Sequence, residues 1–303
     1  MGLGKLLVVG YLSIDTITDA AGRSRRMPGG ACLYTGLGAR HAGAEVTLAA
    51  SVGEDYPAAW LEAMALAGLD LSNLDRKRVR SRRADIRHLA DGRRVSTHFD
   101  DPDWWVSSAE LAPEWPADLA GAGMAVACPM PVGSLGCLVE DARERGVPVV
   151  ADTSEAFAGA DPGAILQLVP ALRVFAPSRE ETRLLCPGLA DGEAARRLAR
   201  LGPAVVQKLG ADGLRVVGPG GRGVLHLPSV ATDVVDPTGA GDATVGALAS
   251  GLLAGLELAD AARAALATGA VALSGEGPAA LGVRFPGITF SNAAPLGAAL
   301  ELE

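Results

Sequence analysis

Short apolar runs alternate with longer amphipathic stretches along most of the chain. The first apolar run covers 5–10, a stretch that opens on glycines covers 29–43, and a second apolar run covers 44–53. Further apolar runs lie at 124–129, 148–154, 172–178 and 203–210, and further helical stretches lie at 57–68, 135–146 and 192–202. Apolar strands that alternate with helices predict a three-layer α/β fold, with a mostly parallel sheet covered by helices on both faces.

Two polar segments interrupt this alternation, at 15–29 and 78–101. Both alternate in part between polar and apolar residues, and the second contains Asp91–Gly92, a pair typical of tight hairpin turns. We therefore predict a small antiparallel β flap that projects from the main sheet. The segments that contribute it are about residues 13–28 and 78–103.

The second polar segment is rich in arginine. Five of its arginines are candidates for contact with an anionic substrate: Arg78, Arg80, Arg82, Arg83 and Arg87. The alternative is that they are solvated charges on exposed strand edges, where they discourage pairing with other chains. The neighbouring pair Trp104–Trp105 is expected to anchor the end of the flap to the core rather than to stack on a substrate.

Length, charge and composition limit the classes of function. The chain has 303 residues, of which 49% are hydrophobic, and this is enough for one large α/β domain over 1–303. Its net charge of −8 argues against a nucleic-acid or anionic-membrane partner. No stretch of about 20 uncharged apolar residues occurs and the N-terminus does not resemble a signal peptide, so we expect a cytoplasmic protein. The four cysteines lack the spacing of a metal site and are expected to be reduced and mostly buried.

The segment DPTGAGD, at 236–242, carries the most specific chemistry. The residues after it favour a helix, so Gly239, Ala240 and Gly241 are expected at the helix N-terminus. Unpaired backbone N–H groups and the positive end of the helix dipole bind anions there, and glycine lets a phosphate approach the backbone closely. Asp242 would lie beside such an anion, where a carboxylate can take the proton of an attacking hydroxyl. The alternative is a glycine turn with a capping aspartate that serves the structure alone.

Together with four other segments in the same order, this motif resembles the signatures of the ribokinase-like (PfkB) carbohydrate and nucleoside kinases. The segments are VVGYLSID at 8–15, PGGACLYTGLGARHAGAEVTLAASVGED at 28–55, APSREETRLL at 176–185, VVQKLGADG at 205–213 and DVVDPTGAGDATVGAL at 233–248. The resemblance implies a ribokinase-like fold and an ATP- and Mg²⁺-dependent kinase. Its acceptor would be a hydroxyl of a sugar or polyol, with a nucleoside as the alternative. Family members often dimerise through the flap, so a homodimer is a further expectation.

The resemblance also implies roles for individual residues. It assigns catalysis to Asp242, with the backbone of Gly239, Ala240 and Gly241 as the anion hole. It assigns acceptor binding to Asp15, Gly29, Gly30 and Tyr34, and nucleotide binding to Lys208, Gly210, Gly213 and Thr238. It assigns the organisation of Mg²⁺ through water to Glu181, and a monovalent cation such as K⁺ is a further expectation at Asp236. Independently of the resemblance, Asp152 follows an apolar run at the carboxyl end of a predicted parallel strand, which makes it a candidate for nucleotide or metal contact.

Two positions depart from the family pattern. Tyr34 stands where the family usually has asparagine, which changes the size and polarity of the acceptor pocket. Ser178 replaces the asparagine of the Asn-x-x-Glu element, although a serine can still hold a water. These departures keep open a non-catalytic ligand sensor on the same fold, whereas the intact Asp242 favours an enzyme. An NAD-dependent oxidoreductase is disfavoured because no GxGxxG follows the first strand.

Overall fold

The computed structural model describes residues 4–89, 94–96, 102–113, 119 and 121–288. The Asp91–Gly92 turn predicted for the flap lies outside these residues. In the part of the chain described, no helix combines the length and the apolar character needed to cross a membrane.

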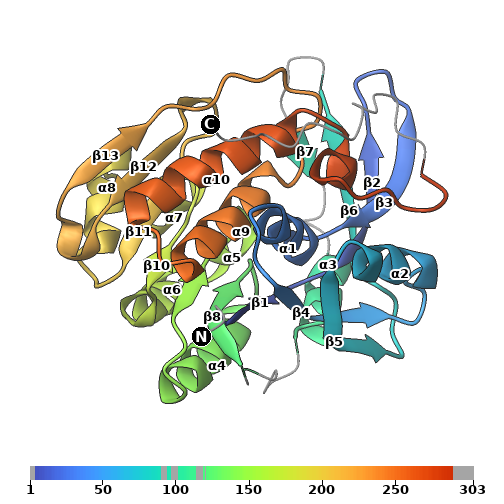
Figure 1. Cartoon of the computed structure of the whole chain (residues 1–303), viewed down its shortest axis with the longest axis horizontal. Coiled ribbons are helices and arrows are strands. Elements are labelled where there is room, and N and C mark those ends of the chain that lie inside the picture. Colours follow the sequence, from blue (N-terminus) through green and yellow to red (C-terminus); the bar gives the residue numbers. More distant parts are fainter. Residues whose placement is uncertain (1–3, 90–93, 97–101, 114–118, 120, 289–303) are drawn as a thin grey trace.

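A twisted sheet of nine strands forms the centre of the molecule (Figure 1). In spatial order its strands are β13 (Val224–Leu227), β12 (Leu214–Val217), β11 (Ala204–Lys208), β10 (Val174–Phe175), β9 (Val149–Ala151), β8 (Ala122–Ala127), β1 (Lys5–Val9), β4 (Val46–Gly53) and β5 (Leu69–Lys77). All pairings from β11 to β5 are parallel, and the hairpin of β12 and β13 adds two antiparallel strands at one edge. The mostly parallel sheet predicted from the sequence is confirmed.

Helices cover both faces of this sheet. One face carries α1 (Ala31–His41), α2 (Ala58–Leu66), α9 (Ala240–Leu253) and α10 (Leu258–Leu273). The other carries α3 (Pro102–Glu110), α4 (Val132–Glu144), α5 (Glu155–Ala160), α6 (Pro162–Leu168), α7 (Arg179–Leu185) and α8 (Asp191–Ala199). Short 3₁₀ turns are η1 (Val169–Ala171), η2 (Gly210–Asp212), η3 (Pro219–Gly221) and η4 (Gly277–Leu281).

The alternation of side chains along β1 shows how one strand serves two cores. Leu6 and Val8 join the cluster beneath α1 and α9, whereas Leu7 and Val9 join the cluster on the opposite face. Successive strand residues point to opposite faces, so a strand covered on both sides must be apolar throughout. Each fully buried side chain of this kind contributes about 1.5–3 kcal/mol to stability.

A second, four-stranded sheet forms the flap at one end of the main sheet (Figure 1). Its strands in spatial order are β3 (Ser24–Gly29), β2 (Ser13–Thr18), β6 (Arg83–His88) and β7 (Arg94–Ser96). The outer pairings are antiparallel, but the central pairing of β2 with β6 is parallel. The reason is that β2 and β6 continue from β1 and β5, two strands that run in the same direction in the main sheet. The flap itself is confirmed, and its central pairing is the feature that local alternation did not indicate.

Candidate active site

The N-terminus of α9 begins on a glycine in the left-handed conformation. Gly239 is the cap residue, with φ +76°, and no side chain caps the helix by a hydrogen bond. A Cβ added at Gly239 would overlap the ring of Tyr34, so this position has room for glycine alone. Gly241 has ordinary helical geometry, and a Cβ there would lie 3.6 Å from Cδ of Lys208, an ordinary contact. The two glycines therefore serve different needs: Gly239 is required by the backbone and by Tyr34, whereas Gly241 keeps the space in front of the helix open.

A cavity of about 400 Å³ lies in front of this helix. Gly239, Gly241 and Asp242 line it, and Asp242 lies in the first turn of α9. The other walls come from the flap and from the carboxyl ends of parallel strands, the edge of an open α/β sheet at which ligands usually bind. The fold thus brings segments from both ends of the chain to one site.

Asp15, on flap strand β2, lies in this cavity although only 4% of the residue is exposed. The hydroxyl of Ser13 donates a 2.6 Å hydrogen bond to its Oδ1. A Cβ at Gly29 would overlap the Asp15 carboxylate, and a Cβ at Gly30, with φ +95°, would overlap the carbonyl oxygen of Tyr11. Gly30 lines the cavity itself, whereas Gly29 acts by leaving room for Asp15.

Tyr34 also lines the cavity and is nearly fully buried in α1. Among the described residues, its buried hydroxyl has no hydrogen-bond partner. Burial raises the pKa of the Tyr34 hydroxyl well above its usual value, and the nearby carboxylates of Asp236, Asp15 and Asp242 raise it further. The phenol is therefore neutral at physiological pH, and its ring forms the wall against Gly239.

One side of the cavity is apolar and aromatic. Ile86 and Trp104 contribute to it, as does Phe157, whose ring centroid lies 5.7 Å from that of Trp104. Trp104 is buried, as expected for an anchor of the flap, but it faces the cavity as well. Beside it, the guanidinium of Arg82 is sandwiched between the rings of Tyr11, at 4.4 Å, and Trp104, at 4.5 Å. Burial lowers the pKa of Arg82 to about 10, so it keeps its charge at neutral pH.

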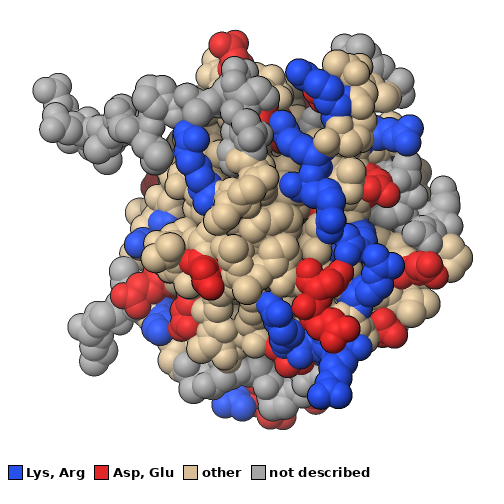
Figure 2. Space-filling model, turned by 90° about the vertical axis from the view of Figure 1, so that its right-hand side faces the viewer, with Lys and Arg blue, Asp and Glu red and all other residues tan. Residues whose placement is uncertain are grey.

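The five flap arginines lie in different surroundings in the structure. Of these, only Arg82 lines the main cavity. Arg83 forms an ion pair of 2.5 Å with Asp55. The remaining three have exposed side chains: Arg78, Arg80 and Arg87. Figure 2 shows the face of the molecule that carries the flap, where basic side chains form a band interrupted by acidic ones.

Three ionisable groups that line the same cavity lie close together: Lys208, Asp152 and Glu181. Lys208, at the end of β11, forms a 2.5 Å ion pair with Asp152, which follows β9. Glu181 lies near both, and burial raises its pKa to about 8, with the charge of Lys208 opposing the shift and that of Asp152 adding to it. Burial also raises the pKa of Asp152, although Lys208 opposes it. Two buried carboxyls thus share one lysine.

Glu181 has a structural partner as well. It is the third residue of α7, and its Oε2 accepts a 2.6 Å hydrogen bond from the backbone N–H of Ser178. The Ser178 hydroxyl accepts in return from the N–H of Glu181 at 3.2 Å, which completes a capping box. Ser178, the departure from the family pattern, is therefore a helix cap in this chain.

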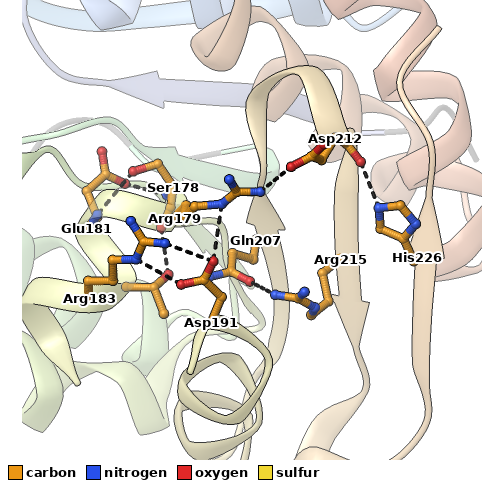
Figure 3. A network of polar contacts seen from close by, with 10 residues as sticks. Ser178, Arg179, Glu181, Arg183, Asp191, Gln207, Asp212, Arg215 and His226 are labelled. Carbon is orange, nitrogen blue, oxygen red and sulfur yellow. Dashed lines mark hydrogen bonds and ion pairs between the residues drawn. The ribbon is translucent and has the colours of Figure 1, made fainter. Parts of the chain in front are cut away.

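A network of ion pairs holds the neighbouring turn in place (Figure 3). Arg179 forms ion pairs with Asp191 at 3.2 Å and with Asp212 at 2.5 Å. Asp212 belongs to η2, whose Gly210 lines the main cavity. Gly213, with φ +84°, does not line it; a Cβ there would overlap the carbonyl oxygen of Leu227, so the tight turn after η2 requires glycine.

A smaller cavity of about 100 Å³ lies beside the main one. Lys208 and Gly241 line both cavities. Its remaining lining is mostly apolar and includes Leu214, Leu266 and Leu273. The helix start of α9 therefore lies between a polar cavity and an apolar slot.

The residues expected to hold cations differ in position. Glu181, expected to organise Mg²⁺, lines the main cavity, whereas Asp236, expected beside a monovalent cation, is 1% exposed and lines neither cavity. Thr238, expected to contact the nucleotide, also lines the main cavity. Within the described ranges, no group of three or more histidine, cysteine, aspartate or glutamate side chains is placed to hold a metal ion. Glu181 and Asp152 line the main cavity together with Lys208, and Glu180 lines it as well.

Comparison with known proteins identifies the family to which the chain belongs. The model of the pfkB family carbohydrate kinases matches residues 4–283. The chain belongs to the PfkB family. Its members are phosphotransferases, so the kinase class and the ribokinase-like fold predicted from the sequence are confirmed.

Solved structures of ribokinases and of a nucleoside kinase share the fold at low sequence identity. A ribokinase from Cryptococcus neoformans in complex with ADP has a TM-score of 0.74 and 21% identity, and the match covers 90% of this chain and 95% of that one. A nucleoside kinase from Burkholderia thailandensis in complex with inosine has a TM-score of 0.75 and 21% identity, with 90% and 92% covered. A ribokinase II of E. coli, described as putative in its source and solved with ATP and Mg²⁺, has a TM-score of 0.73 and 19% identity, with 91% and 94% covered.

A curated relative shares a shorter and more similar segment. The cytidine kinase of Thermococcus kodakarensis is 42% identical over 69 residues, which is 23% of this chain and 24% of that protein. The match thus spans about a quarter of the relative.

Reasoning from the sequence missed several residues of the PfkB cavity. Ser13 lies two positions before Asp15 on the same strand, and the period of two along a strand was a signal that could have found it. Phe157 reaches the cavity through tertiary packing, and nothing local in the sequence separated it from other aromatic residues. Arg82 was one of the five candidate arginines, but the sequence did not distinguish it from the other four.

Proposed function

We propose that this PfkB kinase transfers the γ-phosphoryl group of ATP to a hydroxyl of a small-molecule acceptor, with Asp242 as the general base. The observation that carries the proposal is the start of α9, which has no side-chain cap and carries Asp242 in its first turn, facing the same cavity as Asp15. Backbone N–H groups of Gly239, Ala240 and Gly241 stabilise the charge that develops on the transferred group. Asp242 accepts the proton of the acceptor hydroxyl.

The acceptor and the nucleotide approach α9 from opposite sides. Asp15 accepts hydrogen bonds from acceptor hydroxyls and is oriented by Ser13. Lys208 lines both cavities and provides positive charge near the phosphates, while the apolar slot beside Leu214 and Leu266 suits a purine base. The flap covers the acceptor and excludes water, which would otherwise compete as the phosphoryl acceptor.

The lysine end of the cavity fits Mg²⁺ held through water. Glu181 and Asp152 share a single lysine, and burial raises the pKa of both carboxyls although the charge of Lys208 opposes the shift. Carboxylates and waters are the ligands that Mg²⁺ prefers. When bound, the ion neutralises phosphate charge during the transfer. Gly210 and Thr238 lie along the same cavity and are assigned to the nucleotide.

Among acceptors, the apolar wall favours a nucleoside over a free sugar or polyol. Ile86, Trp104 and Phe157 present hydrophobic surface, and two of them present aromatic rings on which a base can stack. A free sugar would leave most of this wall without a partner. The inosine complex of the Burkholderia kinase and the cytidine kinase segment are consistent with this choice.

The test is an ADP-release assay over nucleosides, free sugars, polyols and sugar phosphates, with Asp242→Asn as the control for contaminating activity. We expect nucleosides to have the highest kcat/KM. A higher kcat/KM for a free sugar or polyol would assign the enzyme to carbohydrates. Calorimetric binding of ATP without ADP release from any acceptor would contradict the kinase proposal and favour a ligand sensor.

Phe157→Leu sharpens the choice of acceptor. Removing the ring should lower kcat/KM for nucleosides by about tenfold, since a stacked aromatic pair contributes about 0.5–1.5 kcal/mol beyond its area. Activity on any free sugar should stay within about twofold. Equal losses for both classes would show that Phe157 supports the fold rather than a base.

A further inference from the structure

The buried carboxylate of Asp236 lies just before the glycines of α9, where the family resemblance suggests a monovalent cation. Its Oδ1 accepts a 2.9 Å hydrogen bond from the N–H of Thr238, and its Oδ2 accepts a 3.1 Å bond from the N–H of Gly277. A charge buried to this degree requires a positive partner. The question is whether an ion or a side chain supplies it.

Arg25, from flap strand β3, reaches this carboxylate. Its Nη2 lies 3.8 Å from Oδ2 of Asp236, and its Nη1 lies 2.9 Å from Oε2 of Glu276. The side chains of Asp236 and Glu276 are 2% and 10% exposed, so one guanidinium bridges two buried carboxylates. A planar guanidinium that stays charged at any physiological pH is well suited to such a bridge.

The alternation of side chains along β3 determines that Arg25 points toward Asp236. Arg25 and Met27 are two positions apart and share one face of the strand. Met27 is buried against Gly277, and Arg25 pairs in register with Ile17, a member of the small core beneath the flap. Arg26, between them, is exposed. The guanidinium of Arg25 is thus directed at the body of the protein by the same pattern that buries Met27.

A monovalent cation does not fit beside this arrangement. Both oxygens of Asp236 already accept backbone hydrogen bonds, and the guanidinium lies within 4 Å of one of them. A second positive charge at this distance would be repelled in a site shielded from water. We infer that Arg25 takes the place of the monovalent cation, so that this PfkB kinase works without K⁺.

Arg25 is a positioning residue. Asp236 accepts a hydrogen bond from the N–H of Thr238, one residue before the cap of α9. By fixing the Asp236 carboxylate, the guanidinium of Arg25 therefore helps to position the glycines that face the cavity. Because Arg25 comes from the flap, the bridge also joins the flap to this loop. The inference rests on the proposed function for its kinetic readout alone, since the effect of cations on folding can be measured without an acceptor.

The first experiment uses the unmodified protein. Its thermal melting is followed in KCl, NaCl and choline chloride at equal ionic strength, and ADP release is followed in the same buffers with the acceptor that the ADP-release screen identifies. We expect the same Tm in all three salts and a kcat in K⁺-free buffer within about twofold of that in KCl. A higher Tm specific to K⁺, or activation by K⁺ of about fivefold or more, would overturn the inference whether or not an acceptor is known.

The second experiment removes the guanidinium. Arg25→Ala should lower kcat by about tenfold or more, because a displaced helix start misplaces the reacting groups. It should also gain what the unmodified protein lacks, a rise of Tm with K⁺ or with dilute guanidinium chloride well below the onset of unfolding. Arg26→Ala is the matched control and should show neither effect.

Two outcomes would contradict the role of Arg25. One is that Arg25→Ala behaves like Arg26→Ala in kcat and Tm. The other is that neither K⁺ nor guanidinium changes the Tm of Arg25→Ala. If this variant fails to fold, Arg25→Gln serves for the same comparison, and the first experiment decides on cation dependence without any variant.

Discussion

Helices α7 and α9 both begin at the edge of the active-site cavity, and each carries an acid at its third position. In α7 the cap Ser178 and the acid Glu181 satisfy each other's backbone N–H groups. In α9 the cap is Gly239, and no side chain closes the helix start. The start of α7 is thus closed by a side-chain cap, whereas the start of α9 has none, as the proposed anion hole requires. The comparison teaches that a glycine in place of a serine cap can separate an anion-binding helix start from a structural one.

The largest effect is expected when the acid of each helix start is replaced by its amide. Asp242→Asn keeps the size of the side chain but removes proton acceptance, and we expect phosphoryl transfer to fall by about 10²-fold or more. ATP binding, measured by calorimetry, should be nearly retained. Glu181→Gln is the matched change in α7, where an amide can still complete the capping box, and its effect should be much smaller. Comparable losses in both variants would contradict the distinction between the two helix starts.

Gly241 tests whether the open space before α9 holds the phosphoryl group. Gly241→Val should lower transfer by about 10²-fold, because its side chain occupies the approach to the backbone N–H groups. Its Tm should stay nearly unchanged, since Gly241 is helical and a Cβ meets only ordinary contacts. Gly239→Ala is the counterpart and should lower the Tm, because it combines a left-handed φ, at about 1–2 kcal/mol, with overlap of the Tyr34 ring. If Gly241→Val transferred phosphate at the normal rate, this result would contradict the assignment of the anion hole to the N-terminus of α9.

The raised pKa of Glu181 predicts how Mg²⁺ dependence changes with pH. Its pKa is about 8 in the folded, ligand-free protein, so Mg²⁺ must displace a proton at pH 7. The Mg²⁺ concentration for half-maximal rate should therefore fall by about several-fold between pH 7 and pH 9, and Glu181→Gln should flatten this change while requiring more Mg²⁺. An identical pH profile in both proteins would show that Glu181 does not organise the ion.

The same shift has a consequence for stability, with a defined sign. The carboxyl of Glu181 stays protonated in the folded state up to about pH 8, whereas the unfolded chain releases the proton near 4.5. The free energy of unfolding should therefore decrease as the pH rises through this interval, and less so in Glu181→Gln.

The smallest expected effect is that of the serine cap. Ser178→Ala removes one half of the capping box and should cost about 1 kcal/mol, which lowers the Tm of a chain of this size by about 2 °C. Transfer should stay within about twofold at saturating Mg²⁺. Ser178→Asp, which restores an acceptor at the cap, should recover the Tm. A loss of transfer in Ser178→Ala without a loss of stability would show that the serine acts on the nucleotide or metal.

Local pattern was sufficient for most of the fold. The apolar runs that became β1, β4, β8, β9, β10 and β11 and the glycine-led start of α9 were all predicted, because period and turn chemistry are local properties. The parallel pairing within the flap depends on where distant strands meet, which no local pattern contains. The edge hairpin of β12 and β13 was also not predicted, although its two strands are consecutive in the sequence. The homodimer expected through the flap stays a prediction.

The site shows the same division. The motif residues Asp15, Lys208 and Asp242 reach one cavity, as the order of the segments implied, although their roles stay proposals. Arg25 was one of several arginines in a polar segment, and its pairing with Asp236 joins residues more than two hundred positions apart. The sequence around Arg25 did not distinguish it from the other arginines of this segment, because only the folded structure brings it next to Asp236.

The close approach of Gly29 and Asp15 has a consequence for how such a site can evolve. The Asp15 carboxylate occupies the volume that any side chain at position 29 would need. A lineage that retains the acid is confined to glycine at position 29, and a lineage that gains a side chain there must first lose the acid or move its strand. A single mutation at position 15 loses the carboxylate, and a single mutation at position 29 displaces it. We therefore expect the two positions to change together.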